Sequence, residues 1–248
     1  MSRVRPDPRP RRALARIAGR VGLAWLALSA LLVVPLRWLD PPLDAFMIEA
    51  RIAAWRRDDR HYVFRHRWVP LQAISPDLPL AAIAAEDQTF PFHWGFDFAA
   101  MHAAYLHDLD SRHIRGGSTI SQQVAKNLFL WSGRSYLRKA IEAYFTVWIE
   151  ACWPKRRILE MYLNVAQFGR GTYGAEAASR RFFHEPASRL TPSQAALLAA
   201  VLPDPDHEHP AAPSPWLERR RAWILGQMRD LGGPRFLRVL DAYPDRRL

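Results

Sequence analysis

The pattern of apolar and polar residues along the chain predicts a largely helical protein. Between residues 43 and 231, most segments repeat apolar positions at the spacing of an amphipathic helix. One stretch, residues 61–69, alternates its side chains instead and predicts a short strand. The predicted helices are 43–57, 78–87, 96–108, 119–130, 135–152, 155–165, 174–183, 193–202 and 215–231.

Two of these helices carry more specific expectations. Within 135–152, an apolar stripe recurs at helical spacing and is expected to face the core; it consists of Leu137, Ile141, Tyr144 and Trp148. Helix 119–130 follows two glycines, and Ser118 is the expected N-cap.

An uncharged run from Val21 to Leu36 precedes all of these segments. At about 1.5 Å per residue it spans roughly 24 Å, and Trp38 and Leu39 extend it toward the thickness of a bilayer core. A cleaved signal peptide is the rival interpretation, because Ala27–Ala30 are mostly small. Apolar residues continue past that point, so we predict a single transmembrane helix over residues 21–39.

The charge of the chain supports a membrane interpretation. Residues 1–20 hold seven arginines and one aspartate, and therefore carry +6 of the formal net charge of +11. A basic tail directly before an apolar run favours a cytoplasmic N-terminus and argues against a nucleic-acid binder. Its proline-rich composition predicts disorder over residues 1–20.

Few residues suggest a metal or a disulfide. Cys152 is the only cysteine, so no disulfide can form within the chain. His207, Glu208 and His209 lie in the proline-rich segment 203–215, which predicts a solvated loop rather than a metal site.

Two sequence blocks carry candidate chemistry. Residues 85–97 offer a carboxylate, Glu86, and residues 116–127 offer a glycine turn that opens a polar and then cationic helix. If Ser118 caps that helix, Ser118, Gln122 and Lys126 share one surface row. Free N–H groups at a helix start can hold an anion, so the two blocks predict a base that faces an anionic leaving group.

Three further blocks follow in order. Arg138 and Glu142 stand four residues apart, a spacing that an ordinary helical ion pair also explains. Residues 155–174 form a basic helix start and a glycine-punctuated loop, and residues 190–198 form a helix start.

In this order the five blocks resemble the peptidoglycan glycosyltransferases that polymerise lipid II, and above all the monofunctional biosynthetic transglycosylases. The resemblance runs from about Trp68 to Met228 and includes the segments 68–71, 83–88 and 126–131. It implies a mostly α, lysozyme-like glycosyltransferase domain with a small membrane-facing lobe, preceded by one N-terminal transmembrane helix. The expected organisation is a basic cytoplasmic tail (1–20), the transmembrane helix (21–39), a linker and the start of the small lobe (40–67) and the glycosyltransferase domain (68–248).

The resemblance also implies residue roles. Glu86 is similar to the general base that deprotonates the 4-hydroxyl of lipid II, and Glu142 to a second, supporting carboxylate. Attack on the lipid-pyrophosphate-linked strand would form a β-1,4 linkage with inversion. Lys126 and Arg134 match cations that stabilise the departing diphosphate. The other expected substrate-binding residues are Asp87, Phe90, His93, Gly117, Ser118, Thr119, Gln122, Gln123, Asn127, Arg138 and Lys139.

The remaining expectations concern partners and alternatives. No cofactor is required, although a divalent cation (Mg or Mn) could assist at the pyrophosphate. The expected partners are lipid II, the lipid-linked glycan strand, the membrane and proteins of the division or elongation machinery, with the enzyme in the cell inner membrane and its catalytic domain in the periplasm. No Ser-x-x-Lys occurs, so transpeptidase activity is not expected. A lytic glycan-cleaving enzyme and an inactive membrane scaffold are the alternatives.

Overall fold

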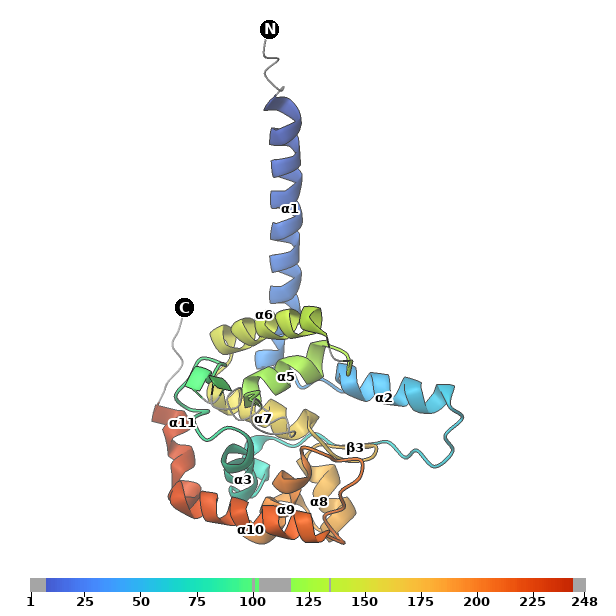
Figure 1. Cartoon of the computed structure of the whole chain (residues 1–248), viewed down its shortest axis with the longest axis vertical. Coiled ribbons are helices and arrows are strands. Elements are labelled where there is room, and N and C mark those ends of the chain that lie inside the picture. Colours follow the sequence, from blue (N-terminus) through green and yellow to red (C-terminus); the bar gives the residue numbers. More distant parts are fainter. Residues whose placement is uncertain (1–7, 100, 103–116, 134, 243–248) are drawn as a thin grey trace.

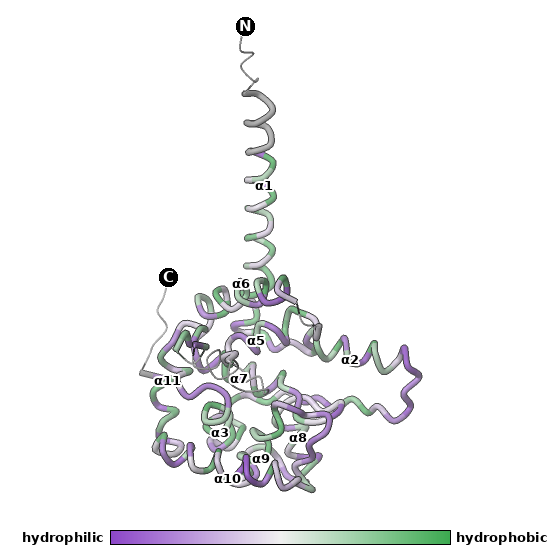
Figure 2. The backbone as a smooth tube through the Cα atoms, viewed as in Figure 1, coloured by the Kyte–Doolittle hydropathy of each residue, from purple (hydrophilic) through white to green (hydrophobic). Residues whose placement is uncertain are grey.

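The computed structural model describes residues 8–99, 101–102, 117–133 and 135–242. Its first helix, α1 (Pro8–Val33), stands away from a helical domain (Figure 1). Figure 2 shows apolar residues along the coloured part of this helix. The segment Arg16–Arg37 is long and apolar enough to cross a membrane, and only 11% of its most apolar window is buried within the molecule. A core helix would be largely buried, so α1 lies mostly outside the core of the domain, which its last residue, Val33, enters.

The start of α1 corrects the expected disorder of residues 1–20. The chain is helical from Pro8 onward, and residues 1–7 lie outside the described part. Arginine and alanine have high helix propensity, and a helix nucleated on an apolar span extends at little cost. Pro8 and Pro10 fall in the first turn, where no intrahelical N–H bond is lost.

The predicted helices of the domain are present within two residues of their expected bounds, except that helix 96–108 lies largely outside the described residues. Short 3-10 turns (η1, Pro35–Arg37; η2, Leu71–Ala73; η3, Ala187–Arg189; η4, Gly233–Arg238) connect some of them. The helices are α2 (Ala45–Arg56), α3 (Asp77–Glu86), α5 (Ile120–Phe129), α6 (Tyr136–Cys152), α7 (Lys155–Val165), α8 (Ala175–Phe183), α9 (Pro192–Val201), α10 (Pro215–Asp230) and α11 (Val239–Ala242).

The predicted strand 61–69 is much shorter in the structure. Only β1 (Arg65–His66) is extended in a ladder, parallel to β3 (Thr172–Tyr173), which pairs antiparallel with β2 (Gln167–Gly169). Gly171 lets the chains approach, because a Cβ there would lie 2.4 Å from the carbonyl oxygen of Val63. The alternating pattern therefore predicted a strand correctly, but its length was wrong, because the partner strand β3 has only two residues.

The core lies where two nearly uniformly apolar helices meet. The side chains of α3 and α9 are buried on almost every side, and α3 packs against both α9 and α10. In the half nearer α1, α5 packs against α6 and α7. Since Glu86 is the last residue of α3, this arrangement places it at the end of a rigid core helix.

Helix α6 does not bury the stripe that its sequence suggests. Leu137 is 67% exposed, and Ile141, Tyr144 and Trp148 are only half-buried. The buried face holds Glu142, Phe145, Thr146 and Ile149. This helix has two apolar faces, and periodicity alone does not decide which one the domain covers.

The outer face of α6 meets α1 instead. The Tyr144 hydroxyl donates to Ser29 Oγ at 2.9 Å, and its ring lies 6.0 Å from that of Trp25. Further along, Trp153 Nε1 donates to the Val33 carbonyl at 3.0 Å, and Arg37 donates to the Cys152 carbonyl at 2.8 Å. The C-terminal end of the membrane-span candidate is therefore packed against the domain.

Candidate active site

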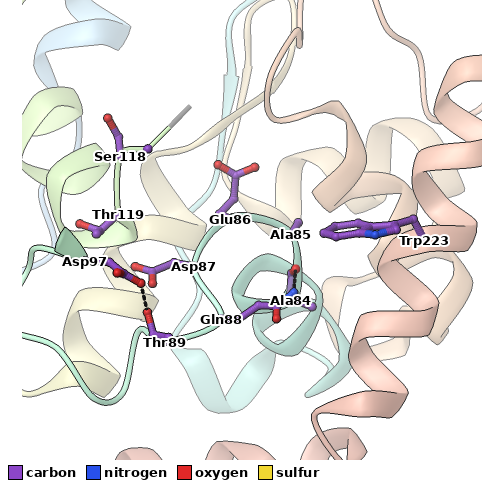
Figure 3. A pocket seen from close by; sticks show the side chains of 11 residues that line it. Ala84, Ala85, Glu86, Asp87, Gln88, Thr89, Asp97, Ser118, Thr119 and Trp223 are labelled. Carbon is purple, nitrogen blue, oxygen red and sulfur yellow. Dashed lines mark hydrogen bonds between the residues drawn. The ribbon is translucent and has the colours of Figure 1, made fainter. Parts of the chain in front are cut away.

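Glu86 lines a cavity of about 330 Å³. The cavity lies between α3, α10 and the loop that precedes α5. In Figure 3 its carboxylate projects into the open space between Ser118 and Trp223. The lining residues are Ala84, Ala85, Glu86, Asp87, Gln88, Thr89, Asp97, Gly117, Ser118, Thr119 and Trp223. The structure thus brings the two sequence blocks together around one carboxylate.

The Glu86 carboxylate is held in place by α5. Gln123 Nε2 donates to Glu86 Oε2 at 2.8 Å, and the Tyr162 hydroxyl lies 3.4 Å from Gln123 Oε1 on the other side of that amide. Burial raises the pKa of Glu86 above its usual value, while the Gln123 hydrogen bond and the charges of Arg220 and Lys126 oppose that rise. A carboxylate with a raised pKa is better suited to accept a proton from a hydroxyl.

Asp87 anchors the start of α5. Its carboxylate is buried, accepts from the Ile120 backbone N–H at 3.0 Å and lies 2.9 Å from His93 Nε2. Phe90 is completely buried in the core, and its ring packs edge-on against His93. Of these three predicted contact residues, only Asp87 lines the cavity.

The start of α5 differs from expectation by one residue. Thr119, not Ser118, is the N-cap; it accepts from the Gln122 N–H, and the Gln122 side chain accepts from the Thr119 N–H at 3.0 Å. Gln122 is buried in this capping box and is absent from the cavity lining. Backbone N–H groups at the start of α5, which were predicted to bind an anion, already donate to Asp87 and Thr119 of the protein itself.

Glu142 is the centre of a basic cluster on α6. It is 2% exposed and accepts from Arg138 at 2.9 Å and from Lys139 at 2.5 Å. Lys139 also donates to Ser118 Oγ at 3.0 Å, which connects this cluster to the cavity. An ordinary surface ion pair is therefore excluded, because the carboxylate is buried.

Lys126 adds a third cation to this cluster. Burial lowers its pKa, and the charge of Glu142 is the main opposing influence. Its Nζ lies 5.3 Å from the ring centre of Phe46. Three cations thus face one buried carboxylate, an excess of positive charge suited to a phosphate group. Half-buried Asn127 follows on α5, and Arg134 lies outside the described residues.

Two residues of α10 belong to the site, although no sequence motif predicted them there. Arg220 donates to the Ala85 carbonyl at 3.0 Å, and Trp223 lines the cavity. Both lie more than 130 positions after Glu86 in the chain, so only the packing of α10 on α3 reveals them.

The donor set does not suggest a protein-held metal. Within the described ranges, no three His, Cys, Asp or Glu side chains are gathered closely enough to hold an ion. Both oxygens of Glu142 accept from cations, which leaves that carboxylate poorly suited as a metal ligand. His207 pairs with Asp204 in the loop after α9.

Comparison with known proteins agrees with this geometry. The family model described as "Transglycosylase" matches residues 55–229. Proteins named biosynthetic peptidoglycan transglycosylase are similar along nearly the whole chain. The one from Cronobacter sakazakii is 52% identical over 90% of this chain and 93% of its own, and the one from Klebsiella oxytoca is 56% identical over 80% and 82%. The one from Xanthomonas campestris pv. campestris is 48% identical over 95% of both chains. The chain therefore belongs to the transglycosylase family.

Proposed function

We propose that this chain polymerises the glycan strands of peptidoglycan, with Glu86 as the general base. The relatives are named for biosynthetic transglycosylation, and the substrate class follows from that name. The observation that carries the residue assignment is the position of Glu86: a carboxylate of raised pKa in an open cavity, joined to a basic cluster through Gly117–Thr119 and Lys139.

In the proposed reaction, Glu86 accepts the proton of the 4-hydroxyl of lipid II. The oxygen forms a bond to the anomeric carbon of the growing strand from the face opposite its pyrophosphate. The bond from that carbon to the pyrophosphate oxygen breaks, and the lipid pyrophosphate departs with the electron pair. The product is a β-1,4 linkage with inverted configuration.

The basic cluster serves the leaving group. A pyrophosphate already leaves readily, so charge stabilisation rather than a strong acid is needed. Lys126, Arg138 and Lys139 supply positive charge, and Glu142 keeps the last two oriented. Arg134 is assigned to the same role on the resemblance alone. A Mg or Mn ion, where one takes part, would add positive charge at the pyrophosphate.

The alternatives account for less of this arrangement. A lytic enzyme that cleaves finished glycan has no pyrophosphate to hold, and the cations around Glu142 would have no partner in its substrate. An inactive scaffold has no use for a carboxylate held by Gln123 in an open cavity.

The proposal places α1 across the cell inner membrane, with the N-terminus in the cytoplasm and the domain in the periplasm. The arginines before the apolar span support this orientation, because positive residues are retained on the cytoplasmic side. Lipid II and the lipid-linked strand would then reach the site from the outer leaflet. Contacts with division or elongation proteins belong to this proposal and are tested by co-purification.

The test is polymerisation of labelled lipid II by the purified full chain. Wild type is expected to produce long glycan, and Glu86→Gln to lose about 10²–10⁴-fold in rate, the usual contribution of a general base. Glu218→Gln, a half-exposed carboxylate on α10, is the matched control and is expected to retain activity. Shortening of preformed strands by wild type would support the lytic enzyme instead, and a fully active Glu86→Gln would contradict the assigned base.

A further inference from the structure

Helix α10 contributes one side chain, Trp223, to the lining of the cavity that holds Glu86. Trp223 is 43% exposed and lies beside Ala85, and the Glu86 carboxylate projects into the space between Trp223 and Ser118 (Figure 3). The wall formed by Ala85 and Trp223 is apolar. The remaining lining, from Glu86 through Asp97 and Ser118, is mostly polar.

Trp223 is held in a defined position relative to Glu86. The guanidinium of Arg220 lies 4.4 Å from the centre of the indole, and the same side chain donates to the Ala85 carbonyl at 3.0 Å. One turn further, Gln88 Nε2 donates to Gln227 Oε1 at 2.8 Å. Two contacts therefore fix α10 on both sides of Trp223 against the end of α3, where Glu86 lies.

The exposure of Trp223 is not explained by the membrane. Helix α10 lies at the end of the domain far from α1 (Figure 1). Single exposed apolar side chains are common, and Trp216 on the same helix is 42% exposed. Of the two, Trp223 is the one that lines the cavity with Glu86. It also contacts Arg220, whose side chain donates to the Ala85 carbonyl.

The chemistry of the two walls indicates a sugar. A pyranose ring has an apolar face of axial C–H groups and an edge of hydroxyls. Its apolar face can pack on an aromatic ring while its hydroxyls meet polar groups opposite. A sugar lying on Trp223 would direct hydroxyls toward Glu86, which accepts a proton in the proposed reaction.

We propose that Trp223 is the stacking platform for the sugar ring that carries the attacking hydroxyl, and that Arg220 positions both the indole and the end of α3. This inference rests on the proposed function. It adds a residue that determines how the acceptor is bound, on a helix that carries no recognised motif.

The test compares three variants of the full chain in the polymerisation of lipid II: Trp223→Ala, Trp223→Phe and Trp216→Ala. Trp223→Ala is expected to raise KM about five- to tenfold with a smaller change in kcat, the order expected for one lost aromatic contact. Trp223→Phe should recover most of that loss, and Trp216→Ala should behave as wild type. A KM for Trp223→Ala equal to that of Trp216→Ala would overturn the proposal.

A binding measurement separates this inference from the proposed function and from misfolding. A soluble GlcNAc–MurNAc disaccharide, which lacks pyrophosphate and cannot act as donor, is titrated into wild type and Trp223→Leu, and binding is followed by saturation-transfer NMR. Saturable binding that weakens severalfold in Trp223→Leu, a variant that keeps an apolar side chain, would support the platform even if wild type forms no glycan. Absence of binding to wild type, or equal binding to Trp223→Leu, would overturn the platform even if wild type polymerises.

Discussion

At the scale of single residues, Glu86 is balanced between opposing influences. Burial raises its pKa, whereas the hydrogen bond from Gln123 and the positive charges of Arg220 and Lys126 favour the ionised form. The family resemblance implied that Gln123 is a substrate-binding residue. The structure shows it bonded to the carboxylate itself, at 2.8 Å.

This balance predicts the pH dependence of activity. A base must be ionised, so activity should fall as pH drops through the raised pKa of Glu86, above the range of an ordinary glutamate. Gln123→Leu removes a hydrogen bond to the ionised form, which raises that pKa further and should move the acidic limb of kcat/KM to higher pH.

The measurement is the pH profile of initial polymerisation rates at low lipid II concentration. Gln167→Leu serves as control, because Gln167 binds Asp206 in another part of the domain. An acidic limb that stays in place or moves to lower pH in Gln123→Leu would contradict this account of Glu86.

At the scale of elements, the start of α5 determines how the site is assembled. Local sequence allows either Ser118 or Thr119 as N-cap, and both have the right chemistry. The capping box with Gln122 and the hydrogen bond from Thr119 Oγ1 to the Gly95 carbonyl, at 2.7 Å, select Thr119. Ser118 is then free to meet Lys139 at the edge of the cavity.

The two neighbouring residues should therefore respond differently to the same change. Thr119→Ala is expected to lower the free energy of unfolding by about 1–2 kcal/mol, since it removes the cap and a buried hydrogen bond. Ser118→Ala should change stability by much less. Urea unfolding followed by circular dichroism measures both, and equal losses would show that the cap has been assigned to the wrong residue.

At the scale of the whole molecule, α1 and the domain share a junction of buried hydrogen bonds. Arg157 is largely buried and donates to the carbonyls of Leu36 and Leu39 at 3.0 and 2.7 Å and to Asp40 at 2.9 Å. Together with the Trp153 bond to Val33, these contacts fix the end of the apolar segment on α6 and α7. The cavity is thereby held at a set position relative to the candidate membrane span.

This junction predicts where the chain can be shortened. Deletion of residues 1–39 should leave Trp153 Nε1 and two donors of Arg157 without their carbonyl partners, each at a cost of about 1–3 kcal/mol if no water replaces them. Deletion of residues 1–32 keeps all three carbonyls. Thermal unfolding in detergent should give the higher Tm for the chain that begins at Val33, and equal Tm values would argue against a structural role for the junction.

The helices, the apolar N-terminal span and the family could be predicted from the sequence alone. Periodicity, capping residues and contiguous motifs are local properties, and the mostly helical architecture is confirmed, while the family match is consistent with the predicted lysozyme-like fold. The sequence also identified the loop-and-helix blocks that surround Glu86.

Only the tertiary structure decided which faces and distant residues those elements bring together. It buried the face of α6 that carries Glu142, placed Phe90 in the core and added Arg220 and Trp223 from α10 to the site. The reason is that burial depends on what packs against an element. The sequence of a helix with two apolar faces does not show which face is covered, and the sequence around a single tryptophan does not show which residues it contacts.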